Sequence, residues 1–203
     1  MIVAGGPSAG DERASLAALR GQSRVIAINN SWHLCPWADV LYACDLAWWR
    51  RYSGAAGFAG LKLGADPAVD RKPWGVRSIR VQQTVDRILT DRPGVIGWGG
   101  NSGFHALNLA VQFGVRRIVL VGYDMQVEAG LHWHGAHEGM NNPSQQSTAR
   151  WRRIIDAAAP DLALLGVEVI NASAVSALTA YPKIPLMEAL HADHDLAVNR
   201  SAD

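Results

Sequence analysis

The chain has 203 residues, with 19 Lys and Arg against 18 Asp and Glu, so its formal net charge is +1. This balance excludes a polybasic protein that binds nucleic acid in general through its phosphates. Hydrophobic residues make up 49% of the chain and charged residues 18%, which excludes a disordered chain and predicts one buried core. No apolar run reaches the roughly 18 residues that span a bilayer, and the first residues do not resemble a signal peptide. We therefore expect no membrane span and a cytoplasmic location.

Two features of the composition bear on function. Cys35 and Cys44 are too few for a disulfide scaffold and lack the spacing of metal ligands, so we interpret them as apolar filler in a reducing compartment. Tryptophan is unusually frequent, with eight Trp against three Phe and four Tyr. Because the indole ring offers a wide stacking face, this excess indicates a binding cleft.

Short apolar runs alternate with segments of helical period along the chain, which is typical of β-α units around a parallel sheet. We predict a single-domain α/β fold over residues 1–185, Rossmann-like, with a mostly parallel sheet and helices on both faces, followed by a tail over 186–203. The predicted strands are Ile2–Ala4, Val25–Asn29, Val40–Cys44, Val76–Val81, Val95–Gly97, Ile118–Gly122 and Val167–Asn171, and the predicted helices are Glu12–Arg20, Ser102–Phe113 and Ser147–Leu165, the last broken near Pro160.

The helix over Ser102–Phe113 has apolar residues almost all round, so we expect a buried crossover helix with Ser102 as its N-cap and its end at Gly114. Residues 53–73 have little periodicity and predict an irregular excursion or lid. Residues 127–147 are a long polar loop, and such loops are usually functional or disordered; we favour function. The tail, with His191, Asp193, His194 and Asp195, is predicted to be a short helix and frayed residues.

Two glycine turns follow predicted strands and precede helical segments. Glycine lets a backbone approach a ligand closely, and the free amides at a helix start favour an anion such as phosphate. Neither GxGxxG nor GxxxxGK[ST] is present, so an ordinary NAD fingerprint and a P-loop are not supported. Ordinary tight turns are the alternative, but the pair favours a nucleotide cleft. The candidate nucleotide-binding residues in these turns are Gly5, Gly6, Pro7 and Ser8 in the first and Gly100, Asn101, Ser102 and Gly103 in the second.

Polar residues at the ends of the predicted strands are further candidates for nucleotide binding. They are Asn29, Asn30, Asp45, Tyr123 and Asp124. Ligands of an open α/β sheet bind outside the carboxyl ends of its strands, where these side chains would converge, although Asn and Asp are also frequent in plain turns. In the neighbouring loops Trp32, Trp98 and Trp133 are predicted to stack on a base or sugar, whereas Trp48, Trp49 and Trp151 are predicted to lie in the core or an interface.

The polar loop contains His132, His134 and His137, which can supply a general base, substrate contacts or metal ligands. Their spacing resembles the HxHxDH ligand motif of metallo-β-lactamase-fold hydrolases, but Ala136 stands where that motif has its carboxylate. We therefore assign no metal ligand and predict that the three His are catalytic or contact the substrate. Solvated loop residues are the alternative.

The ordered series GGPS, AINN, ACD, GNSG, VGYDM and HWHG covers about residues 1 to 180. In this order it resembles the superfamily of the bacterial lipooligosaccharide sialyltransferases and the archaeal-type 6-hydroxymethylpterin diphosphokinases, with their often phage-encoded relatives. The resemblance implies that the first glycine turn, Asn29, Ser102 and Gly103 bind a nucleotide sugar and that His132 deprotonates the acceptor hydroxyl. Asp45 stands where the sialyltransferases have Asn.

From these observations we expect a nucleotide-sugar-dependent glycosyltransferase that needs no cofactor and acts on an acceptor still to be identified. His134 and His137 would orient the acceptor or assist the leaving group. The first alternative is a diphosphokinase that transfers diphosphate from ATP to a pterin-like alcohol, with Asp45 and Asp124 holding magnesium. The others are a nucleotide-binding, phage-type module without turnover and a metal hydrolase. A small homo-oligomer is expected as readily as a monomer.

Overall fold

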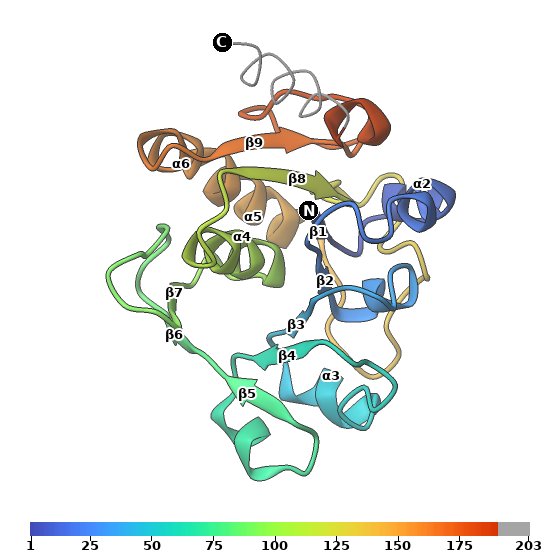
Figure 1. Cartoon of the computed structure of the whole chain (residues 1–203), viewed down its shortest axis with the longest axis vertical. Coiled ribbons are helices and arrows are strands. Elements are labelled where there is room, and N and C mark those ends of the chain that lie inside the picture. Colours follow the sequence, from blue (N-terminus) through green and yellow to red (C-terminus); the bar gives the residue numbers. More distant parts are fainter. Residues whose placement is uncertain (191–203) are drawn as a thin grey trace.

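A single seven-stranded sheet organises the chain in the computed structural model, which describes residues 1–190. All of its strand pairs are parallel, in the order β5-β4-β3-β2-β1-β8-β9 (Figure 1). The expected Rossmann-like α/β fold is confirmed. The order reverses between β1 and β8, which makes this the topological switch point of the sheet. The strands are β1 (Ile2–Val3), β2 (Ile26–Ile28), β3 (Val40–Ala43), β4 (Leu61–Gly64), β5 (Val76–Ser78), β8 (Arg117–Val121) and β9 (Glu168–Asn171).

Helices cover both faces of the sheet (Figure 1). Alternate strand residues point to opposite faces, so Ile2 packs into one core cluster and its neighbour Val3 into the other. The first cluster lies under α4 (Ser102–Gln112), α5 (Gln145–Ala157) and α6 (Ala159–Leu164), and the second under α1 (Ser8–Asp11), α2 (Arg13–Ala18), α3 (Leu46–Arg51) and the 3-10 helices η1 (Asn29–His33) and η2 (Pro67–Arg71). Within residues 1–190, no helix combines the length and the apolar character that a bilayer crossing requires.

Two predictions between residues 53 and 82 are wrong. The segment 53–73, expected to be irregular, contains β4, which pairs with β3 and β5. The expected strand Val76–Val81 is divided into β5 and β6 (Arg80–Gln82), because the amide of Ile79 still bonds to Gly64 while that of Arg80 bonds to Gly94. As a result β6 pairs with β7 (Val95–Gly97) in a separate two-stranded sheet.

The buried crossover helix is confirmed as α4, and Gly114 follows it with φ +79°. Its N-cap is Asn101 and not Ser102, because Asn101 has the extended backbone that a cap requires and accepts the amide of Phe104 at 2.9 Å. Phe113, expected among the buried residues, is 50% exposed since it forms the C-cap of the helix.

The last predicted helix is interrupted, as expected. α5 and α6 meet at Ala158, and Pro160 lies in the first turn of α6, where its missing amide proton costs no helical hydrogen bond. The N-cap of α5 is Ser144, which forms a capping box with Ser147. Residues 186–190 are helical. The tail residues His191, Asp193, His194 and Asp195 lie outside the described residues.

The two-stranded sheet is attached to α4 by a buried amide side chain. Asn108 Oδ1 accepts the backbone amides of Leu89 at 2.9 Å and Gly97 at 3.0 Å, and its Nδ2 donates to the Leu89 carbonyl at 2.8 Å. A methyl group cannot replace these bonds. The position of β7 beside α4 therefore depends on Asn108, together with Gln112, whose Nε2 donates to the Val95 carbonyl at 2.8 Å.

We expect Asn108→Ala to lower the free energy of unfolding by about 2 kcal/mol, since a buried amide left without an acceptor costs about 1–3 kcal/mol. Denaturant unfolding measures the loss. Gln22→Ala is the control, because Gln22 bonds only to an exposed carbonyl of its own segment, and it should change stability by less than about 0.5 kcal/mol. Equal stabilities of the two variants would contradict this role of Asn108.

Candidate functional site

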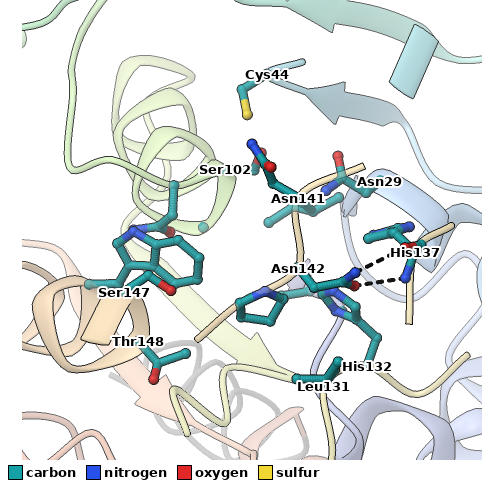
Figure 2. Close-up of a pocket in the computed structure, with 18 of the residues that line it drawn as sticks. Asn29, Cys44, Ser102, Leu131, His132, His137, Asn141, Asn142, Ser147 and Thr148 are labelled. Atoms are coloured by element: carbon teal, nitrogen blue, oxygen red, sulfur yellow. Dashed lines mark hydrogen bonds between the residues drawn. The ribbon is translucent and has the colours of Figure 1, made fainter. Parts of the chain in front are cut away.

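A pocket of about 660 Å³ lies at the carboxyl ends of the strands, beside the switch point between β1 and β8 (Figure 2). Its volume is in the range of small-molecule sites, and its place is where α/β folds bind ligands. Both glycine turns and the polar loop contribute to its wall. Of the predicted site residues, Gly5, Gly6, Asn29, Asp45, Gly100, Asn101, Ser102, Gly103, Asp124, His132 and His137 line it.

The first glycine turn is packed against the end of β8. The Gly6 amide donates to the Gly122 carbonyl at 2.9 Å, and the Ser8 amide donates to Asp124 Oδ2 at 2.9 Å. A Cβ on Gly6 would lie 2.5 Å from that carbonyl oxygen. Pro7 has no amide proton, so within the described chain Gly5 holds the one amide of this turn that has no acceptor. The glycines of this turn therefore allow it to pack against the end of β8, and they leave little of its backbone free to bind a phosphate.

The second glycine turn leaves two amides open where it enters α4, although the Gly99 amide donates to Asp86 and the Gly100 amide to the Trp98 carbonyl. Gly99 and Gly100 have φ +53° and +74°, a conformation that favours glycine, and they lead into α4. The amides of Ser102 and Gly103 have no acceptor among residues 1–190, and both residues line the pocket. The start of an 11-residue helix with open amides attracts negative charge. This turn is the better place for a phosphate group.

Asn29 and Asn30, adjacent in the chain, lie in different surroundings. Asn29 lines the pocket, and its buried Oδ1 has no hydrogen-bond partner within the described residues. An acceptor of this kind can bind a hydroxyl or amino group of a ligand. Asn30 does not line the pocket, because its side chain donates to the Tyr52 hydroxyl at 2.7 Å and accepts from Trp48 Nε1 at 2.8 Å. Its role is structural.

Tyr123 and Asp124 hold the two glycine turns in place. The Tyr123 hydroxyl is buried and donates to the Gly103 carbonyl at 3.0 Å, so this residue does not line the pocket. Both Asp124 oxygens accept from Ser8, one from its amide and one from its hydroxyl. Burial raises the pKa of Asp124, and the bonds from Ser8 partly offset this rise. In this arrangement Asp45 is the exposed carboxylate of the pocket wall.

The three His of the polar loop form a cluster at the edge of the pocket. The rings of His132 and His134 are stacked with centroids 5.1 Å apart, and the His137 ring lies 4.6 and 4.8 Å from them. Burial, and secondarily the neighbouring imidazoles, lower the pKa of His132 and of His134 to about 4. Burial also lowers the pKa of His137, which the charge of Asp45 raises in part. All three rings are therefore neutral at neutral pH.

Backbone contacts fix the loop that carries this cluster. The Trp133 amide donates to the Gly5 carbonyl at 3.0 Å, and a Cβ on Gly5 would lie 3.0 Å from His132 Nδ1. The absent side chain of Gly5 thus makes room for an imidazole. The side chain of Asn142 accepts the His137 amide at 2.7 Å and donates to the His137 carbonyl at 2.9 Å, shown dashed in Figure 2.

The tryptophans predicted to stack on a ligand do not line the pocket. Trp98 lies under the guanidinium of Arg150 at 4.3 Å, while Trp32 and Trp133 are partly buried against the core. Trp48 and Trp49 are buried, as predicted, although Trp48 also contributes to the pocket wall. Trp151, predicted to lie in the core or an interface, instead lines the pocket and offers the ring for stacking.

Sequence analysis missed several residues of the pocket wall. They lie mainly in the second half of the polar loop and the start of α5, where the only signal was the polarity of residues 127–147. Cys44, interpreted as filler, also lines the pocket, but burial raises the pKa of its thiol to about 12, so it is no nucleophile at neutral pH. Besides Trp151, the other missed residues are Ala4, Ile28, Ala47, Trp48, Gly122, Met125, Gln126, Leu131, Gly139, Met140, Asn141, Asn142, Pro143, Ser144, Ser147 and Thr148.

Comparisons of the chain with protein-family models, with curated proteins and with solved structures gave no match. The resemblance stated from the ordered motifs therefore stays a prediction. What can be said of function rests on the geometry of the pocket.

Proposed function

We propose that this protein is a nucleotide-sugar-dependent glycosyltransferase that transfers a sugar to an acceptor hydroxyl. One observation carries the proposal: the open amides at the start of α4 and two members of the His cluster, His132 and His137, lie on the same pocket of about 660 Å³. A group that binds phosphate and a group that accepts a proton are the two parts that such a transfer needs. The proposed reaction requires no cofactor.

The donor is proposed to bind with its phosphate at Ser102 and Gly103, where free amides and the helix dipole favour negative charge. The unpaired Oδ1 of Asn29 would accept from a hydroxyl or amino group of the nucleoside. Trp151 would stack on the base or the sugar. These assignments place the bond that breaks between α4 and the His cluster.

His132 is the proposed general base, since it lines the pocket and its ring is neutral at neutral pH. In the transfer, the acceptor hydroxyl gives its proton to the imidazole while its oxygen bonds to the anomeric carbon of the sugar. The bond between that carbon and the phosphate oxygen breaks, and the nucleotide leaves with the electron pair. The start of α4 stabilises the charge on the leaving phosphate. His137 also lines the pocket and keeps the proposed orienting role, whereas His134 does not line the pocket and is given no role in the transfer.

A diphosphokinase that uses ATP and magnesium is the second candidate, supported by the exposed carboxylate of Asp45 on the pocket wall. The second expected ligand, Asp124, already accepts two hydrogen bonds from Ser8. One exposed carboxylate, which accepts a weak bond from the Cys44 thiol at 3.3 Å, makes a weaker magnesium site than two, so this candidate ranks second. A nucleotide-binding module without turnover would use the same pocket.

We expect a cytidine or uridine nucleotide to stabilise the protein in EDTA as well as in magnesium. At about 100 times its dissociation constant a ligand adds about 2.7 kcal/mol, which raises the melting temperature of a chain of this size by about 5–11 °C. A thermal-shift screen of CMP, CDP, UDP, ADP, GDP and ATP measures this effect. Asn29→Ala should reduce the shift, and Gln22→Ala should retain it.

Each other outcome of the screen has a defined meaning. A shift with ATP only in the presence of magnesium would favour the diphosphokinase. A shift with a nucleotide, followed by no hydrolysis or transfer when the corresponding nucleotide sugar is incubated with acceptors, would favour the module without turnover. No shift with any nucleotide would contradict the proposed function.

A further inference from the structure

We propose that His132, His134 and His137 form a binding site for one divalent transition-metal ion. Each residue offers one ring nitrogen, and these nitrogens all lie within 4.8 Å of one another. From the sequence we assigned no metal ligand, because Ala136 stands where a known motif has its carboxylate. The structure supplies a different reason for a site: three imidazoles that converge without a carboxylate.

The distances in the cluster are close to those of a metal centre. Zn–N bonds of about 2.0–2.1 Å in tetrahedral geometry place the ligand nitrogens about 3.3 Å apart. The cluster needs to close by at most about 1.5 Å from its 4.8 Å limit, which ring rotation about the side-chain torsions can supply. The turn between His132 and Gly135, closed by a hydrogen bond of 3.0 Å, brings the rings to one side of the loop.

Groups behind the cluster orient two of its members. His132 Nδ1 faces Gly5, and a hydrogen bond to the Gly5 backbone raises the pKa of His132 against the larger effect of burial. Metal-bound His usually donates its second ring N–H to such a carbonyl, which leaves the other nitrogen for the metal. The Asn142 side chain bonds to the amide and the carbonyl of His137 and so fixes the backbone position from which that imidazole extends.

The site is open on one side. His132 and His137 line the pocket, whereas His134 does not line it and is stacked on His132. Three protein ligands with a fourth position open to a pocket are typical of a catalytic zinc site and not of a closed structural one. Imidazole ligands suit zinc, copper, iron and nickel.

A metal ion in this site would change how the acceptor loses its proton, a consequence that rests on the proposed function. His132 would then be a ligand and not the free base. An acceptor hydroxyl bound at the open position has a lowered pKa and releases its proton to bulk water. Its oxygen then bonds to the anomeric carbon as the bond to the nucleotide phosphate breaks. The metal site itself does not depend on this reaction.

The test is the metal content of the full chain. The metal is first removed with a chelator, and the chelator is removed by dialysis. When Zn²⁺ is then added, one equivalent should remain bound through gel filtration. Co²⁺ should give the visible absorption of a four-coordinate ion. His134→Ala is the decisive variant, because His134 is needed by the metal site and not by the wall of the nucleotide pocket. We expect it to weaken zinc binding by more than the roughly 10- to 100-fold that loss of an outer-shell partner costs.

His33→Ala is the matched control, since His33 is an exposed imidazole that packs on Trp32, with ring centroids 4.0 Å apart, outside the cluster. It should bind one zinc, and Asn142→Ala should bind zinc about 10- to 100-fold more weakly. Thermal unfolding of each variant without metal checks that it folds. If His134→Ala binds zinc as tightly as His33→Ala does, or if the parent chain retains none, the metal site is refuted.

The two proposals fail in different ways. A nucleotide shift without bound zinc would overturn the metal site and leave the proposed function standing. Stoichiometric zinc without a shift by any nucleotide would overturn the proposed function and leave the metal site. A nucleotide shift that His134→Ala retains while it loses zinc would support both.

Discussion

Gly6→Ala is expected to lower the free energy of unfolding by about 3 kcal/mol or more, at the upper end of what overpacking costs. The new Cβ would lie 2.5 Å from the Gly122 carbonyl oxygen and 2.6 Å from Asp124 Cγ. Neither can retreat cheaply, because the carbonyl accepts the Gly6 amide and the carboxylate holds Ser8. The two turns would have to separate.

The melting temperature measures this loss, which corresponds to about 6–12 °C for a chain of this size. Gly57→Ala is the matched control, since its Cβ would meet nothing nearer than Trp32 at 4.0 Å. Its stability should change by less than about 0.5 kcal/mol. A melting temperature for Gly6→Ala within 2 °C (roughly 1 kcal/mol) of the parent would mean that the turns yield easily, against the packing described above.

His132→Ala is expected to reduce turnover of the nucleotide sugar by about 100- to 10,000-fold, the range of a lost general base. The variant removes the ring that faces the pocket beside Gly5, while the amides of α4 that would hold the phosphate stay in place. Binding of the nucleotide should therefore persist as turnover is lost. Release of free nucleotide from the donor, with and without acceptors, measures the rate.

His33→Ala should turn over like the parent, because its imidazole lies outside the cluster. His134→Ala separates the two roles proposed for His132. A free base needs little from a ring outside the pocket wall, whereas a metal ligand set needs all three. Turnover by His132→Ala within about tenfold of the parent would contradict both roles.

Much of the fold was predictable because strands buried on both faces have nearly continuous apolar sequences. Ile118–Gly122 and Val40–Cys44 are of this kind, and both contain strands of the main sheet. β4 lacks the pattern, since Leu61 and Lys62 are not buried, and it was missed. The break between β5 and β6 was also missed, because the change of pairing partner between Ile79 and Arg80 leaves no mark in the sequence.

The role of a site residue could be predicted where its residue type has one structural role at that position. It could not be predicted where the residue type has several. Glycines between a strand and a helix indicated both turns. Only the folded structure shows that Gly6 packs against a carbonyl, whereas the amides of Ser102 and Gly103 are open. Trp151 and Trp98 have the same ring, and Arg150 covers the second of them. The role of Asn142 could not be predicted from the polarity of its loop. Its side chain binds backbone groups of His137, and only the folded loop brings them within reach.

The polar loop and the scaffold that holds it differ in how well they should tolerate substitutions. The first glycine turn and the end of β8 hold each other through Gly6, Ser8 and Asp124, so a substitution in either disturbs both. The loop that carries the His cluster is tied within itself by Asn142 and to the sheet by a backbone bond at Gly5. Its side chains that make no bond to the scaffold can be exchanged with the sheet intact, so new ligand specificities could evolve here without a new fold.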